Sequence, residues 1–450
     1  MEMLVYFCTF SILIQCALAG PGDTIEQLKV SYGNIDLNHF YDKVEVKTLD
    51  GQVPKGLNGT LIRHGCGVFG NTFGEETEKL DRVTHLFDCM ELAQSFHFYE
   101  GQAFFTSHYY DANKNDYFLK VHDQDMTKSS VFYGTVYANY SEEAIQEFRN
   151  WKSENKNTTQ LKRDDVPHVS WWVIGNDVLA NGETQDGTKV DPHNLVNFKD
   201  YSLGGAWPEH DRLEFNPAHE VYDDNLGLIN TVGLYKFNDD RTEQETKRIV
   251  YAIKQLEDGS NQRDYIAEIP YPTADLSGCE DGQLPDPDTW LKYLHSIAST
   301  EHYIVIPETS YLRNPCDNVV SPDVQGYLTP IIYNTSVNGV FSVIPKDDPT
   351  NVMTFEADSH FFITHKFNAF EDENQVHVDV IFYNSAEPYT EFTFLDEAVL
   401  GQTSPDQELR RYSLDLVDGT VTYRKLHDLP EGNWVEFSNC NPNYAGKPYR

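Results

Sequence analysis

Three histidines are the residues of this sequence best suited to metal chemistry: His219, His295 and His365. Each lies at the edge of an aromatic or apolar segment with a polar turn nearby. They are 76 and 70 residues apart, which is too far for one local metal-binding loop but suits ligands from successive sheets around one axis. The rival interpretation is three ordinary packed histidines, because the chain offers 16 from which to choose.

The segment around His365 indicates what must position such a ligand. Phe361–Tyr383 begins as an apolar strand that contains His365, pauses at the polar residues Asn368 and Glu371–Asn374 and continues as a second strand at Val376–Tyr383. Alternation of apolar and polar residues is typical of strands with one buried face. The spacing therefore predicts that His365 is presented by a sheet.

Short aromatic and β-branched runs split by Gly, Asn, Asp and Pro predict an all-β fold. No fixed-period repeat is visible, so this pattern does not choose among a sandwich, a barrel and a propeller. One segment, Ser141–Lys156, is predicted to be a surface helix, and the polar Lys152–Asp165 that overlaps its end reads as an exposed loop. The strand runs include Phe104–Tyr110, Trp171–Ile174, Ile249–Ile253, Tyr303–Ile306 and Phe392–Phe394.

The first 19 residues are predicted to be a secretory signal peptide. The apolar run ends at Ala17-Leu18-Ala19, which is typical of a cleavage site. We expect residues 20–450 to form one domain, because no linker divides them and no later apolar run is long enough to cross a bilayer. Secretion is further indicated by four N-x-S/T glycosylation acceptors at Asn58, Asn139, Asn157 and Asn334.

Charge and cysteine content exclude some functions. The net charge of −37, from 71 acidic against 34 basic residues, repels phosphate backbones and argues against a nucleic-acid partner. The five cysteines after the signal peptide form no CxxC pair, which argues against a zinc ribbon or a thioredoxin-like site. Their odd number leaves one unpaired or paired between chains. They are Cys66, Cys89, Cys279, Cys316 and Cys440.

Six motifs occur in the order found in one family. They are NGTLIRHG (58–65), HLFD (85–88), AHEVYD (218–223), YLHSIASTEHYIVIPE (293–308), HKFNAFED (365–372) and VEFSNCNPNYAGKPY (435–449). From Val53 to Arg450 the chain resembles the carotenoid cleavage oxygenases, with the closest likeness to the animal carotene oxygenases and retinoid isomerase. The resemblance implies a seven-bladed β-propeller with a small helical and loop cap.

The resemblance also implies one Fe(II) ion held by four histidines. His219, His295 and His365 match the first three ligands by motif. Glu183 and Glu436 match glutamates that accept a hydrogen bond from a ligand histidine, which fixes the tautomer of the ring. The other interpretation of Glu436 is an ordinary surface charge. Six other histidines are interpreted as packed or surface residues: His85, His97, His108, His193, His302 and His377.

Two departures from the family pattern stand out. The family's fourth histidine lies beyond the GKPY motif, so we expect a C-terminally truncated chain with an incomplete last blade; the alternative is a degenerate relative.

Two family glycine motifs contain Cys66 and Cys89 here. In an oxidising compartment they suggest a Cys66–Cys89 disulfide, and the alternative is two buried free thiols.

The function implied is dioxygen-dependent cleavage of a double bond in a carotenoid or retinoid-type polyene. The alternatives are a secreted, catalytically impaired carotenoid- or retinoid-binding protein and a polyene isomerase. Glycans at Asn139 and Asn157 would flank the segment with which relatives dock on bilayers, so weak or absent membrane contact is expected. The expected location is the secretory-pathway lumen or the extracellular space.

Overall fold

The computed structural model describes residues 41–68, 90–109, 169–183, 187–195, 203–320, 331–390, 406–428, 435–436, 438 and 440–449. Regular structure in these residues is almost entirely β-strand, so the all-β prediction is confirmed. The signal peptide, the helix and loop of 141–165 and the run 392–394 lie outside them. No helix among the described residues has the length and hydropathy to cross a membrane. Contacts divide the chain into two compact units, and the single domain stays a prediction.

The first unit contains two antiparallel sheets with the strand orders β1-β4-β3-β2 and β5-β6-β7. Ala93 of β3 packs with Trp171, Val178 and Val190 of the second sheet, which joins the two sheets through an apolar core. The strands are β1 (Tyr41–Val46), β2 (Gly59–Val68), β3 (Met90–Tyr99), β4 (Gln102–Tyr109), β5 (Ser170–Ile174), β6 (Asp177–Asn181) and β7 (Thr188–Val190).

The second unit begins with a sheet in the order β12-β11-β10-β8, to which β13 and β9 add at β11 and β10, and a sheet in the order β14-β17-β18. The strands of the first are β8 (Arg212–Glu214), β9 (Val221–Asp223), β10 (Gly227–Phe237), β11 (Glu243–Gln255), β12 (Asn261–Pro270) and β13 (Ala274–Asp275). Those of the second are β14 (Leu291–Lys292), β17 (Tyr311–Arg313) and β18 (Ile331–Tyr333).

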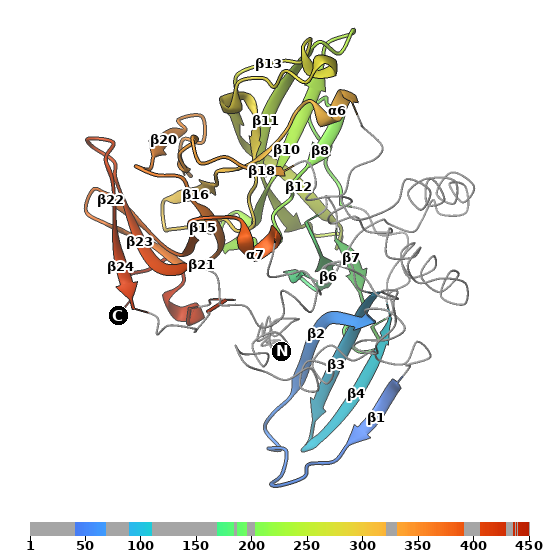
Figure 1. Ribbon diagram of the computed structural model, residues 1–450. Coiled ribbons are helices and arrows are strands. Elements are labelled where there is room, and N and C mark those ends of the chain that lie inside the picture. Colours follow the sequence, from blue (N-terminus) through green and yellow to red (C-terminus); the bar gives the residue numbers. More distant parts are fainter. Residues whose placement is uncertain are drawn as a thin grey trace, which may run out of the picture. The chain divides into compact units, whose positions relative to one another are not determined.

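Two further four-stranded antiparallel sheets complete the second unit, with the orders β15-β16-β19-β20 and β21-β22-β23-β24 (Figure 1). Their strands are β15 (Ala298–Ser299), β16 (Tyr303–Glu308), β19 (Val340–Pro345), β20 (Met353–Glu356), β21 (Phe362–Asp372), β22 (Gln375–Tyr383), β23 (Gln407–Asp415) and β24 (Val421–His427). Single helical turns occur at η4 (Cys279–Asp281), η5 (Pro287–Thr289), α6 (Asp317–Val320), α7 (Glu387–Thr390) and η6 (Pro442–Tyr444).

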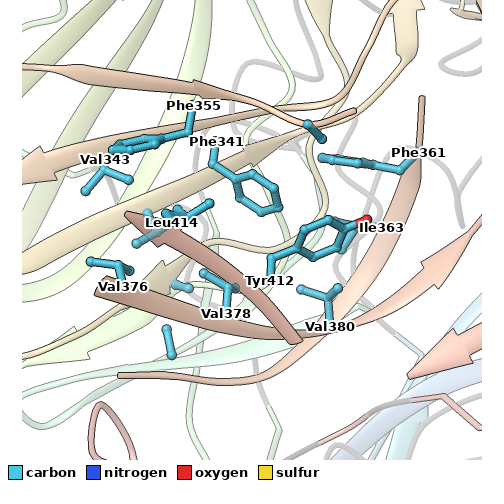
Figure 2. Close-up of a cluster of buried hydrophobic side chains, with 14 of the residues drawn as sticks. Phe341, Val343, Phe355, Phe361, Ile363, Val376, Val378, Val380, Tyr412 and Leu414 are labelled. Atoms are coloured by element: carbon cyan, nitrogen blue, oxygen red, sulfur yellow. The ribbon is translucent and has the colours of Figure 1, made fainter. Parts of the chain in front are cut away.

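The last two sheets pack face to face through alternating apolar residues. β22 places Val376, Val378 and Val380 in one core with Phe341 of β19 and Tyr412 of β23, and all five are buried. Figure 2 shows the rings of Phe341 and Tyr412 close together, with their centroids 5.0 Å apart. Full burial of one such side chain contributes about 1.5–3 kcal/mol, so this interface fixes the relative positions of the two sheets.

A second apolar interface joins the β15-β16-β19-β20 sheet to the sheet that contains β10 and β11. Ile229 and Val250 of that sheet pack with Ile304 and Ile306 of β16 and with Ile344 of β19. Three successive sheets thus stack face to face, as the blades of a propeller do. The seven blades and the incomplete last blade stay predictions.

The predicted strand pair around His365 is confirmed as a hairpin of β21 and β22. Asp372 is paired with Gln375 across a two-residue loop. Glu373 in this loop has a φ of 51°, in the left-handed region that tight hairpin loops require. The turn is therefore Glu373–Asn374, whereas Asn368, Glu371 and Asp372 of the predicted pause lie within β21.

His365 lies in an irregular part of β21. The pairing register shifts between Ile363 and Lys366 and again between Lys366 and Asn368. Each shift inserts an extra residue into β21, and such bulges turn side chains away from the regular alternation of a strand. The bulged stretch thus gives His365 a direction that a regular strand would not.

A disulfide joins Cys279 to Cys316, 37 residues apart, with a Cα–Cα distance of 5.2 Å. It links η4 to the start of α6 in a small apolar cluster beside β13. Cys440 is a free thiol. The proposed pairing of Cys66 with Cys89 stays a hypothesis, because Cys89 lies outside the described residues.

We expect the Cys279→Ser/Cys316→Ser variant to lose about 3–4 kcal/mol of unfolding free energy, because the cross-link closes a long loop in the unfolded chain. Urea unfolding under non-reducing conditions measures this loss as a lower midpoint. Cys440→Ser is the matched control, with an expected change of about 1 kcal/mol or less. Equal midpoints for the double variant and the control would contradict the prediction.

Candidate metal centre

Three segments that are far apart in sequence run side by side and carry the three histidines. The N–H of His219 donates to the carbonyl of His295, and the N–H of Ile297 donates to the carbonyl of His219, both at 3.2 Å. The hydroxyl of Ser296 donates to the carbonyl of Thr364 at 2.7 Å, directly before the third histidine in β21. Hydrogen bonds to the main chain therefore place all three histidines at one point.

The three imidazole rings meet there. Their ligand nitrogens lie within 4.8 Å of one another, and within the described part of the chain they form the one group of this kind. The Nε2 atoms of His219 and His365 are 3.0 Å apart, and the ring centroid of His295 lies 4.7 and 4.9 Å from theirs. His295 and His365 are buried and His219 is partly buried. The predicted ligand residues are therefore brought together.

Glu183 determines the tautomer of His295. Its Oε1 atom lies 2.5 Å from Nδ1 of His295. The hydroxyl of Tyr293 donates to the same oxygen at 2.6 Å. Because an ionised carboxylate only accepts hydrogen bonds, the ring proton lies on Nδ1 and the Nε2 lone pair is available to a cation.

Glu436 does the same for His365, and it is buried rather than a surface charge. One carboxylate oxygen accepts from Nδ1 of His365. The other accepts from Thr364 at 2.7 Å and from the hydroxyl of Tyr383. Gln407 donates to the Tyr383 hydroxyl at 2.6 Å and exchanges two hydrogen bonds with the main chain of the residue before Glu436. The carboxylate is thus fixed from several sides.

The segment that follows Glu436 is held by a side chain near His365. Asn368 donates from Nδ2 to the carbonyls of Tyr444 and Lys447, both at 3.0 Å. The N–H of Gly446 donates to Oδ1 of Asn368, also at 3.0 Å. Asn368 is buried and sits three residues beyond the ligand histidine. These contacts join the HKFNAFED motif to the GKPY motif.

The electrostatics favour neutral rings beside an ionised carboxylate. Burial lowers the pKa of His219 well below its ordinary value, and His365 and His295 act in the same direction. Burial also lowers the pKa of His365 and outweighs the opposite effect of Glu436. For Glu436, burial raises the pKa, but His365 and the hydroxyl donors more than reverse this and lower it. Deprotonated imidazole is the form that binds metals.

Buried aromatic rings pack beside His295. The ring of Tyr389 in α7 lies 5.9 Å from that of His295. Phe362 lies 5.0 Å from Tyr389 and 6.0 Å from Tyr293, and Phe215 lies 5.5 Å from Tyr293. The group of three histidines thus has an apolar, aromatic side.

The donor set fits a metal ion. Two nitrogens bound at about 2.1 Å and about 90° apart lie about 3.0 Å from each other, which is the separation of the Nε2 atoms of His219 and His365. His295 supplies a third lone pair toward them. Neutral imidazole suits iron, zinc, copper and nickel, so the residues fit the Fe(II) that the motifs imply without selecting it.

Comparison with known families gives this site a context. The family model described as "RPE65: Retinal pigment epithelial membrane protein" matches residues 37–450. The chain belongs to this family. The resemblance to the carotenoid oxygenases inferred from the six motifs is therefore confirmed, and in this RPE65-family chain the three histidines lie within the matched region.

Two curated proteins illustrate the relationship. The β,β-carotene 15,15'-dioxygenase of Mus musculus is 23% identical over 441 residues, covering 89% of this chain and 70% of that protein. The chloroplastic carotenoid cleavage dioxygenase 8 of Arabidopsis thaliana is 23% identical over 435 residues, covering 90% and 66%. The chain thus spans about two thirds of the length of these relatives.

Solved structures of Synechocystis apocarotenoid oxygenase share the fold. One variant of that enzyme has a TM-score of 0.62 and 17% identity, covering 95% of this chain and 77% of the enzyme. A cobalt-substituted form has a TM-score of 0.63 and 18% identity, covering 93% and 76%. The architecture of the RPE65-family chain is therefore that of the carotenoid oxygenases.

The histidines interpreted as packed or surface residues do not join the metal-ligand group where they are described. His97 and His193 contact each other, His108 binds the carbonyl of Asn194, His377 binds Ser413 and His302 is exposed beside Glu371. His85 lies outside the described residues.

Sequence reasoning missed the residues that hold the two carboxylates. Tyr293 lies two residues before His295 and is the first residue of the motif YLHSIASTEHYIVIPE, from which only His295 is predicted as a site residue. Tyr383 and Gln407 come from β22 and the start of β23, and nothing in their local sequence points to Glu436. The one available signal for these residues in the sequence is the position of Tyr293 close to His295.

We expect Glu183→Gln and Glu436→Gln each to weaken binding of a divalent metal about 10- to 100-fold, because an amide holds the ring nitrogen less firmly than a carboxylate. Titration of metal-free protein with cobalt(II), followed by its visible absorption, measures the affinity. Glu209→Gln is the control, since Glu209 is an exposed partner of Lys236. Affinities equal to that of the control would show that the two carboxylates do not support the site.

Proposed function

We propose that this chain is a non-haem iron(II) dioxygenase that cleaves a double bond of a carotenoid- or retinoid-type polyene. The observation that carries the proposal is the convergence of His219, His295 and His365, two of them oriented by carboxylates whose side chains are mostly withdrawn from water. The carotene dioxygenase relative supports the reaction type. Two carbonyl compounds would be the products.

In this reaction the protein would bind the metal and orient the imidazole rings that hold it. His219, His295 and His365 would hold the metal, and iron(II) would supply the reducing centre that activates dioxygen. Glu183 and Glu436 keep a proton on Nδ1 of their histidines and thus direct the opposite nitrogen inward. An all-neutral set of imidazoles leaves the positive charge of the metal undiminished.

The aromatic rings beside His295 are suited to a hydrocarbon substrate. A polyene chain offers no hydrogen-bonding groups, so its recognition depends on apolar contact and shape. Phe362 and Tyr389 form a buried aromatic cluster next to the ring of His295. Their π-faces can also stabilise positive charge that develops along the polyene.

We expect purified protein to contain about one iron per chain and to bleach a carotenoid only in the presence of dioxygen. His365→Ala should lose both the iron and the bleaching, because it removes a ligand. His427→Ala is the control, since His427 is exposed on β24. Mass spectrometry of the products distinguishes two carbonyl fragments from an isomerised polyene. Metal-free protein that retains pigment unchanged would favour the carrier function instead.

We also propose that the protein resides in the secretory-pathway lumen or outside the cell. The Cys279–Cys316 disulfide supports this, because disulfides persist in oxidising compartments. Asn58 is exposed at the start of β2, and Asn334 is partly buried beyond β18. Both residues reach solvent, which is compatible with an attached glycan. Asn139 and Asn157 lie outside the described residues.

We expect the protein from a secretory eukaryotic host to carry N-glycans, with Asn58→Gln removing one of them. Peptide-N-glycosidase treatment followed by gel electrophoresis and peptide mapping measures occupancy. Asn225→Gln, which lies outside any acceptor sequence, is the control. A protein retained in the cytosol without glycans would refute the proposed location.

A further inference from the structure

A polar network ties together the three histidine-bearing segments beyond the point where their rings meet. Asp223, Thr300 and Glu371 follow the three ligand histidines by four, five and six residues, respectively. They lie on three different sheets or at their edges: at the end of β9, between β15 and β16, and near the end of β21. Each ligand segment therefore contributes one member to the network.

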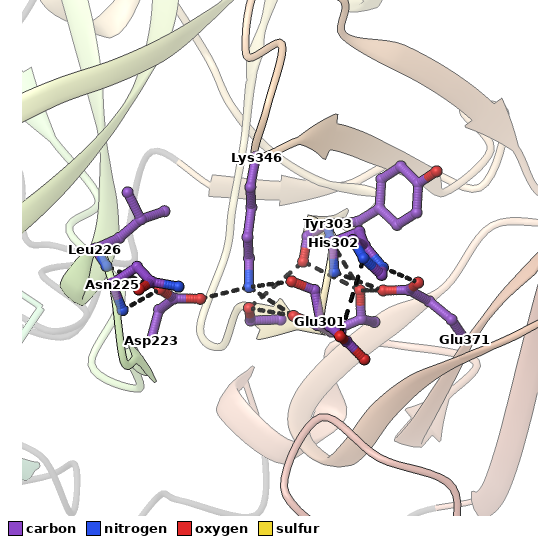
Figure 3. Close-up of polar contacts among 10 residues, drawn as sticks. Asp223, Asn225, Leu226, Glu301, His302, Tyr303, Lys346 and Glu371 are labelled. Carbon is purple, nitrogen blue, oxygen red and sulfur yellow. Dashed lines mark hydrogen bonds and ion pairs between the residues drawn. The ribbon is translucent and has the colours of Figure 1, made fainter.

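Lys346, directly after β19, joins the first two segments. Its Nζ donates to Oδ2 of Asp223 at 2.6 Å, to the carbonyl of Thr300 at 2.6 Å and to the carbonyl of Glu301 at 3.3 Å. Figure 3 shows the lysine extended between Asp223 and the turn that contains Glu301. These three acceptors match the three donors of an ammonium group.

Glu371 joins the third segment to the same turn. Its Oε1 atom accepts from the hydroxyl of Thr300 and from the N–H of His302, the latter at 2.7 Å. Its Oε2 atom lies 2.8 Å from Nδ1 of His302 (Figure 3). We call Lys346, Asp223, Thr300 and Glu371 the outer clamp.

The outer clamp is partly withdrawn from water. The side chains of Lys346 and Asp223 are 13% and 11% exposed, so this ion pair is screened less than a surface pair. The second carboxylate oxygen of Asp223 accepts from the N–H groups of Asn225 and Leu226, both at 2.8 Å. Removal of the lysine would leave a mostly buried carboxylate without its cation, which destabilises the present arrangement of these segments.

Apolar contacts connect the outer clamp to the rings. Val221 and Ile297, each two residues beyond a ligand histidine, belong to one core cluster. Ala298 and Ala369 belong to the next. Packed interiors deform little and transmit a displacement along a strand. A shift of the segments at the outer clamp therefore moves the histidines relative to one another.

We propose that Lys346 and Glu371 are positioning residues for the metal centre, because they fix the spacing of the three ligand segments. This inference rests on the proposed metal site. A metal geometry must be held to within about 0.5 Å by its surroundings, and the outer clamp supplies part of that support. Neither Lys346 nor Glu371 contacts the nitrogen atoms of the three histidines, so each would act on the positions of the rings through the strands that carry them.

The test uses the 450-residue chain stripped of metal and titrated with cobalt(II). We expect Lys346→Met and Glu371→Gln each to weaken cobalt(II) binding about tenfold, the low end of the effect of an outer supporting partner. The visible absorption of bound cobalt(II) should shift, since it reports ligand geometry. Lys346→Arg, which keeps the cation, should restore most of the affinity and the spectrum.

Lys236→Met is the matched control, because Lys236 pairs with Glu209 in an exposed ion pair of the same unit. It should bind cobalt(II) like the unaltered chain. Wild-type affinity and spectrum in both Lys346→Met and Glu371→Gln would overturn the inference. If Lys346→Met fails to fold, Glu371→Gln alone decides, since the glutamine retains the size of the glutamate.

A metal-independent measurement separates this inference from the proposed function. Hydrogen exchange in metal-free protein should be about tenfold faster at the amides of His219 and Ile297 in the clamp variants, because these amides join the ligand segments. Absence of cobalt(II) binding in the unaltered chain would refute the metal site, while the exchange rates would still test the clamp. Unchanged exchange together with unchanged binding would refute the clamp.

Discussion

A buried carboxylate must be surrounded by hydrogen-bond donors, and this requirement at Glu436 governs much of the site. Its donors come from His365, Thr364 and Tyr383, and Gln407 fixes the neighbouring main chain. These hydrogen bonds offset the free-energy cost of burying the charge, and the carboxylate they hold in place orients the imidazole of His365. If Glu436 were at the surface, the ring of His365 would be free to choose either tautomer and several rotamers.

The stacking of antiparallel sheets makes such an arrangement possible. Three of the described sheets pack on one another through apolar faces, which brings together segments from distant parts of the sequence. The backbone bridge between His219 and His295 and the bond from Ser296 to Thr364 then bring the three ligand segments together. The bulges of β21 complete the convergence by turning His365 out of the regular alternation.

Polar contacts hold these segments at several levels. Near the rings, two carboxylates fix the imidazoles. Further along β21, Asn368 binds the turn at Tyr444–Lys447, and Glu371 binds the turn at Thr300–His302. All three bonds of Asn368 and one of those of Glu371 involve main-chain groups, so they fix the path of the chain as well as the side chains. Motif residues that bear no ligand nitrogen therefore still have a structural part in the site.

The sequence by itself determined the residue types and their local setting. Alternation predicted the strands, the polar run 371–374 predicted the turn beside His365, and motif likeness singled out His219, His295 and Glu183. The tertiary structure decided which distant residues are in contact. These contacts are the Cys279–Cys316 disulfide, the hydrogen-bond donors around Glu436 and the ion pair of Lys346 with Asp223. Periodicity reports which face of a strand is buried, whereas these contacts join residues 37 to 123 positions apart, and only the packing of sheets fixes such pairs.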